Sequence, residues 1–141
     1  MTRVELYADI VCPWCFIGSA RLDRVLAAWV GEAEVIHRAF LLRPDAPAEG
    51  IDVPEMLRQR TGRDPKQLFA SAEAAARESG LALDLSKQPR MFPTARAHTL
   101  LRHAEEKKTQ HARLRRAARS GPPAGARAGR ARLSPRHLDT V

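Results

Sequence analysis

The chain has 141 residues, of which 44% are hydrophobic, and a formal net charge of +8 at pH 7. This length fits one domain with a hydrophobic core, and no apolar run approaches the roughly 20 residues needed to cross a bilayer. The charge is uneven, because residues 1–112 hold 16 Lys and Arg against 15 Asp and Glu, whereas residues 113–141 hold 8 Arg against one Asp. The balanced first part does not favour a nucleic-acid partner, and we expect no membrane partner.

The first three residues lead straight into an apolar pattern, without a hydrophobic leader or a small-residue cleavage site. We therefore expect no secretory signal and a cytoplasmic location. Thiol pairs in the cytosol are usually catalytic or redox-sensing.

Two strands and a helix are predicted in the first 43 residues. Apolar residues alternate with Glu5 and Asp9 over residues 4–10, which predicts a strand. An apolar stripe with the spacing i, i+3, i+4, i+7 then predicts a helix that ends near Gly31; it consists of Leu22, Val25, Leu26 and Trp29. Residues 35–42 predict a second strand. The 23 residues between Val11 and Val35 suffice for a helical crossover, so the unit is βαβ with parallel strands.

Cys12-Pro13-Trp14-Cys15 lies between that strand and that helix and contains the only two cysteines of the chain. A free cysteine titrates near about 8.5, and a helix N-terminus in a C-x-x-C motif stabilises the thiolate. Cys12 is therefore the expected nucleophile, and Cys15, one turn further and expected to be more buried, is the expected resolving thiol. Pro13 suits the first helical turn, and Trp14 offers apolar surface to a partner.

Two other uses of the cysteines are open from the residues alone. A closed zinc site needs two more ligands, which His98, His103 and His111 could supply, although their spacings form no compact metal-binding pair. A structural disulfide is the second alternative, but nothing else marks the chain as a small secreted disulfide scaffold.

A linker over residues 43–53 is rich in Pro, Asp and Gly. The rest of the segment up to residue 112 is predicted to be mainly helical, and residues 44–112 together form the predicted insertion. One helix starts at Pro54 and stops before Gly62, and a second runs from Asp64-Pro65 to about Ser79. Its predicted buried side consists of Leu68, Phe69, Ala72, Ala75 and Ala76. Residues 81–93 are predicted to be irregular. Thr94 then caps a helix whose apolar stripe consists of Ala97, Leu100, Leu101 and Ala104.

Three titratable residues near these elements have a structural and a functional interpretation. His37 lies in a predicted buried strand, where a hydrogen-bonded core residue is the favoured interpretation and tuning of the thiolate is the alternative. For His98, packing or a polar contact of its helix is favoured. Asp9 could modulate the protonation of Cys12, but we expect it to be a solvated surface residue.

Residues 4–18, VELYADIVCPWCFIG, resemble the start of the DsbA-like thioredoxin superfamily, in its FrnE-type cytosolic oxidoreductase branch. Residues 93–98, PTARAH, followed by Leu100, Leu101 and Ala104, are similar to a helix of that family's inserted helical domain, so the resemblance spans about residues 3–112. It implies an α/β thioredoxin-like fold with a helical insertion, with Cys12 catalytic and Cys15 resolving. A related branch, the 2-hydroxychromene-2-carboxylate isomerases and kappa-class glutathione transferases, typically holds serine at the position of Cys12.

The chain departs from this family after residue 112. The expected antiparallel strands and cis-proline loop are missing from the pattern, because the residues after Pro93-Thr94 have helical periodicity. We therefore expect a βαβ half over residues 1–43, a helical insertion over 44–112 and a disordered Arg-rich tail over 113–141. An uncovered sheet edge would favour dimerisation.

The tail has three interpretations. Its Arg, Ala, Gly and Pro are what GC-rich codons give when they are read out of frame, so a frameshifted, truncated gene is the leading hypothesis. A native tail that binds nucleic acid through phosphate contacts and a sequencing error are the alternatives.

The function expected from the sequence is that of a thiol-disulfide oxidoreductase, which exchanges a Cys12–Cys15 disulfide with protein or small-molecule thiols. No cofactor is expected, except glutathione as a co-substrate. A glutathione-dependent isomerase or transferase and an inactive truncated remnant are the alternatives.

Overall fold

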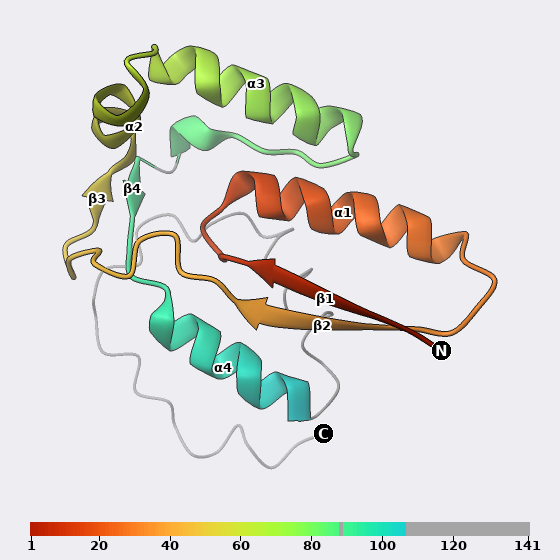
Figure 1. Cartoon of the computed structure of the whole chain (residues 1–141). Helices are drawn as coiled ribbons and strands as arrows, with labels where there is room; N and C mark the ends of the chain where they lie inside the picture. Colours follow the sequence, from red (N-terminus) through yellow and green to blue (C-terminus); the bar gives the residue numbers. More distant parts are fainter. Residues whose placement is uncertain (88, 107–141) are drawn as a thin grey trace, which may run out of the picture.

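The structure is a computed structural model that describes residues 1–87 and 89–106 (Figure 1). Its elements are, in chain order, β1 (Thr2–Ala8), α1 (Pro13–Ala27), β2 (Ala33–Ala39), β3 (Ile51–Asp52), α2 (Val53–Thr61), α3 (Pro65–Glu78), the 3-10 helix η1 (Leu85–Lys87), β4 (Arg90–Met91) and α4 (Ala95–Glu106). The mixed α/β fold agrees with the expected class. The predicted tail, residues 113–141, lies outside the described residues, and the division at residue 43 stays a prediction.

β1 and β2 form a parallel pair, with Val4 opposite Val35 and Leu6 opposite His37. The predicted βαβ unit is thereby confirmed. Figure 1 shows α1 on one side of this pair and α4 on the other. β1 ends at Ala8, two residues before the predicted end of the strand, because the chain then turns: the Cys12 amide donates to the Asp9 carbonyl at 3.2 Å.

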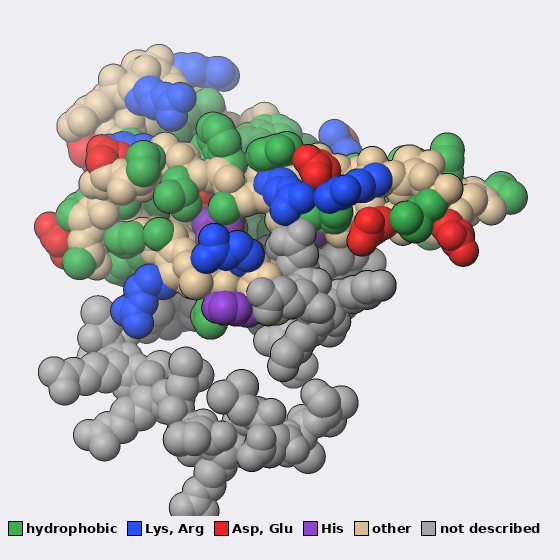
Figure 2. Space-filling model, turned by 60° about the horizontal axis from the view of Figure 1, so that its bottom comes forward, with side chains coloured by type: hydrophobic (Ala, Val, Ile, Leu, Met, Phe, Trp, Pro, Cys, Tyr) green, Lys and Arg blue, Asp and Glu red, His purple; other side chains and the backbone are tan. Residues whose placement is uncertain are grey.

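The predicted apolar stripe of α1 is only partly covered. Ile17 is the fully buried residue of this helix, whereas Val25 is 59% exposed and Trp29 50% exposed. Leu100 on α4 is likewise exposed, although Ala104 on the same stripe is buried. Part of each apolar stripe stays exposed, because a two-stranded sheet is too narrow to cover all of either helix face. Figure 2 shows hydrophobic side chains reaching the surface beside Lys and Arg on the face turned to the viewer.

Capping residues set the limits of the two middle helices. The carboxylate of Asp52 accepts the Glu55 amide at 2.8 Å and that of Asp64 accepts the Lys66 amide at 3.0 Å, as N-cap side chains do. α2 ends at Gly62, which has a φ of 67°. On the predicted inner side of α3, Ala72 and Ala76 are buried and Leu68, Phe69 and Ala75 are partly covered.

A short antiparallel ladder joins two segments that the sequence predicted to be irregular. Ile51 pairs with Met91 and Asp52 with Arg90, which makes β3 and β4 neighbours. The predictions of a linker over residues 43–53 and of an irregular stretch over residues 81–93 were therefore wrong at these four residues, which form strands. Two residues in each strand are too few to produce an alternating pattern, so the ladder leaves no periodic signal in the sequence.

Two arginines of α1 hold the C-terminal end of α3. The Arg21 Nε donates to the Ser79 hydroxyl at 3.0 Å, and both terminal nitrogens of Arg24 donate to the Glu78 carbonyl at 3.2 Å. A guanidinium at this position also matches the negative end of the helix dipole.

No described helix is both long and apolar enough to cross a membrane. Among the described peptide bonds none is cis.

We predict that Arg24→Ala lowers the free energy of unfolding by about 1 kcal/mol, the net contribution of a hydrogen bond, because the Glu78 carbonyl loses its partner on α1. Urea denaturation measures the change. Arg63→Ala, in the exposed loop between α2 and α3, is the matched control and is expected to change stability by less than about 0.5 kcal/mol. Equal effects of the two substitutions would contradict the assigned contact.

Candidate functional site

The turn between β1 and α1 places Cys12 at the beginning of the helix. Cys12 is the N-cap residue, with extended backbone angles (φ −88°, ψ 111°), and Pro13 occupies the first helical turn. The Cys12 sulfur accepts a hydrogen bond from the Cys15 amide, with an Sγ–N distance of 3.4 Å. The predicted position of the motif between a strand and a helix N-terminus is confirmed, and it puts the two side chains one helical turn apart.

Cys12 and Cys15 are free thiols, and both are partly buried. The expectation that Cys15 is the more buried of the two stays a prediction. Trp14 between them is 52% exposed, so a large aromatic surface lies open directly beside the thiol pair. Such a surface is suited to contact with a protein or small-molecule partner.

The acidity of Cys12 differs from the expectation. Burial is the largest cause that raises the pKa of Cys12 to about 11, and the hydrogen bond with the Cys15 thiol adds to it. The amides of Cys15 and Trp14 act in the opposite direction, as a helix N-terminus should, but they do not compensate for desolvation. The expected lowering of this pKa was wrong for the reduced pair. The sequence pattern predicts the helix N-terminus, but it does not show how deeply the sulfur is buried.

Asp9 is buried, which corrects the expectation of a solvated surface residue. It is 4% exposed, and its two carboxylate oxygens have different partners. Oδ2 accepts the Leu42 amide at 2.8 Å, and Oδ1 lies 3.1 Å from His98 Nε2. The carboxylate thus joins the turn before Cys12 to the segment after β2 and to α4.

The histidines have the structural surroundings that the sequence favoured. His98 makes a polar contact from its helix, and its side chain is 9% exposed. His37 is buried in β2. One feature of the sequence does indicate the buried pair: Asp9 is a carboxylate within an apolar run, shortly before the cysteine motif. His98 could not be identified as its partner, because 88 residues separate the two positions in the chain.

No group of three or more His, Cys, Asp or Glu side chains is arranged to hold a metal ion in the described ranges. Of the histidines considered for zinc, His98 contacts Asp9, and His111 lies outside the described residues.

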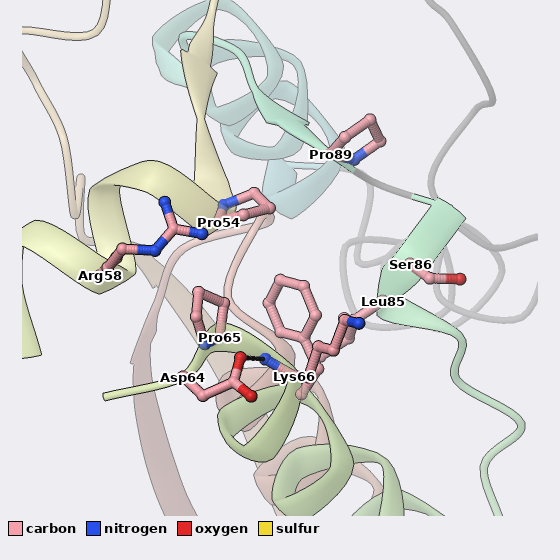
Figure 3. Close-up of a pocket in the computed structure, with 9 residues that line it drawn as sticks. Pro54, Arg58, Asp64, Pro65, Lys66, Leu85, Ser86 and Pro89 are labelled. Carbon is pink, nitrogen blue, oxygen red and sulfur yellow. Dashed lines mark hydrogen bonds between the residues drawn. The ribbon is translucent and has the colours of Figure 1, made fainter. Parts of the chain in front are cut away.

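A cavity of about 290 Å³ lies elsewhere, between the beginnings of α2 and α3 and the segment around η1. Figure 3 shows Pro54, Pro65 and Pro89 at its wall, together with Arg58 and Lys66. Neither cysteine belongs to its lining. The cavity is therefore separate from the thiol pair.

Comparison with known proteins places this geometry in a family. The family model described as "DSBA-like thioredoxin domain" matches residues 3–130 and so extends beyond residue 112, where the resemblance seen in the motifs ended. A search of functionally curated proteins gave no match. Among solved structures, the chain is similar to a probable DsbA oxidoreductase from Streptomyces coelicolor, with 33% sequence identity and a TM-score of 0.72.

That similarity covers 86% of this chain and 55% of the solved chain, so the present chain spans little more than half of that protein's length. The family model nevertheless covers most of the sequence, and the solved structure shares its fold. The chain therefore belongs to the DsbA-like thioredoxin domain family.

Proposed function

We propose that the protein is a thiol-disulfide oxidoreductase of the FrnE type, with Cys12 as the nucleophile and Cys15 as the resolving thiol. The observation that carries this proposal is the placement of the Cys12 sulfur at a helix N-terminus, 3.4 Å from the Cys15 amide, within a DsbA-like domain. A thiol one turn from its neighbour is suited to intramolecular exchange.

The reduced pair would react in two steps. The Cys12 thiolate attacks one sulfur of a partner disulfide, so that a Cys12–partner disulfide forms and the other partner sulfur leaves as a thiolate that takes up a proton. Cys15 then loses its proton and attacks the Cys12 sulfur, which releases the second partner thiol. The partner gains two electrons and two protons, and the pair becomes a Cys12–Cys15 disulfide. The reverse sequence oxidises a dithiol.

The proposed partners are protein or small-molecule thiols and disulfides, with glutathione among the small ones. The exposed ring of Trp14 supports a partner that packs beside the sulfurs. A cysteine at position 12 favours dithiol exchange over the glutathione-dependent isomerase chemistry of the related branch, since exchange requires a sulfur there.

We predict that Cys12→Ser abolishes both the reduction of insulin disulfides and the oxidation of a model dithiol peptide, because no nucleophile remains. Cys15→Ser is expected to accumulate a mixed disulfide on Cys12, since release of the partner requires the second thiol. Non-reducing electrophoresis and intact-mass measurement detect the adduct.

Ser71→Ala, on the exposed side of α3, serves as the matched control and should leave exchange unchanged. Disulfide exchange that survives Cys12→Ser would overturn the proposal. Turnover that requires bound glutathione and persists in this variant would instead support an isomerase or transferase.

The raised pKa of Cys12 predicts a pH dependence of stability. The folded chain holds this thiol proton more tightly than an unfolded cysteine does, because the ordinary pKa is about 8.5 to 9 and the folded pKa is about 11. The stabilisation is therefore complete below pH 9 and is lost as the pH rises through 11.

We expect the free energy of unfolding of the reduced protein to fall more steeply between pH 8 and 11 than that of Cys12→Ser. Urea denaturation at several pH values measures both. Parallel pH profiles would contradict the burial of this thiol.

A further inference from the structure

Asp9 connects three segments beside the thiol pair. Its main-chain carbonyl accepts the Cys12 amide at 3.2 Å and so closes the turn from which α1 begins. Its carboxylate accepts the Leu42 amide at 2.8 Å through Oδ2 and lies 3.1 Å from His98 Nε2 through Oδ1. One residue therefore fixes the turn, the segment after β2 and the beginning of α4 relative to one another.

The contact between Asp9 and His98 is nearly closed to solvent. The exposed fractions of the two side chains are 2% and 9%. A buried carboxylate without partners is strongly unfavourable, so the loss of either acceptor contact is expected to weaken the packing around Asp9. The ion pairs Arg43–Asp45 and Lys87–Asp84 differ, because their carboxylates are 67% and 47% exposed and surface pairs contribute little.

Burial of Cys12 depends on the same turn. The thiol is partly covered and its sulfur lies at the Cys15 amide, and both features require that the chain enter α1 at a fixed angle. The main-chain hydrogen bond from the Cys12 amide to the Asp9 carbonyl sets this angle. The side chain of Asp9 in turn contacts His98 of α4. A path of direct contacts thus runs from His98 through Asp9 to the main chain of Cys12.

We propose that Asp9 and His98 are positioning residues for the thiol pair: their buried contact holds the turn at Cys12 and thereby sets the exposure and reactivity of its sulfur. The proposal rests on the proposed function only in taking Cys12 as the reacting thiol. The two residues act through the main chain of the turn, and the covalent steps belong to the cysteines.

The test is the rate at which iodoacetamide alkylates Cys12 in the full chain, followed by peptide-resolved mass spectrometry from pH 7 to 11. His98→Leu removes the contact, so the turn loosens, Cys12 becomes more exposed and its pKa moves from about 11 toward 9.0. Alkylation at pH 8 is then expected to accelerate by about tenfold for each unit by which the pKa falls.

Two further variants separate positioning from general stability. His98→Gln places a side-chain amide, which can donate to the Asp9 carboxylate, near the position of Nε2 and is expected to retain the original alkylation profile. Leu85→Ala removes a buried side chain of η1, which packs on α3, and should lower the midpoint of urea denaturation without changing the alkylation profile of Cys12.

An unchanged alkylation rate in His98→Leu would overturn the proposal, as would an equal acceleration in Leu85→Ala. Should His98→Leu not fold, Asp9→Asn carries the same test, because it removes the buried charge while keeping an oxygen for the Leu42 amide. Faster alkylation supports positioning and an unchanged rate refutes it.

Failure of the proposed function would be visible separately. If the reduced and oxidised forms do not interconvert in glutathione buffers, the oxidoreductase assignment fails, whereas the alkylation profiles still decide whether Asp9 and His98 position the thiol. Interconversion together with unaltered alkylation profiles would support the oxidoreductase and refute the positioning role.

Discussion

The arrangement around the thiol pair depends on one buried carboxylate. Asp9 directly follows β1, and both of its carboxylate oxygens and its carbonyl are used to hold neighbouring segments. A buried carboxylate in this position would be strongly destabilising if its oxygens had no partners. Hydrogen bonds of Asp9 therefore hold the segments near Cys12 together alongside apolar packing. The parallel sheet has only two strands in the described residues, so it offers little apolar surface for packing.

Burial and helix polarity have opposite effects on Cys12. The amides at the beginning of α1 favour the thiolate, while the covered position of the sulfur favours the thiol, and the second effect is larger. A thiolate is the reacting species, so anything that uncovers this sulfur makes it more reactive. The exposed ring of Trp14 lies next to this sulfur in the chain, so a partner that packed on the ring would change how much of the sulfur solvent reaches.

Local patterns were sufficient to predict the βαβ unit, the motif at the start of α1 and the helices that follow, because each has a periodicity or a cap within a few residues. The covered side of α3 was also correct, with Ala72 and Ala76 buried. The exposure of Val25 and Trp29 could not be predicted, because an apolar stripe identifies one face of a helix but not whether another element covers that face. Asp9 was misjudged for a related reason: its partner His98 lies far away in sequence, and contacts of that kind leave no local pattern.

The ladder of β3 and β4 is small, but its position in the chain gives it a topological effect. The pairing of residue 51 with residue 91 brings together the two ends of a chain segment that contains α2, α3 and η1. The entropic cost of closing such a loop grows slowly, by about 0.6 kcal/mol for each doubling of its length. A longer enclosed segment would therefore add little to the cost of closing the loop, while the paired strands would still set the point from which the chain leads into α4.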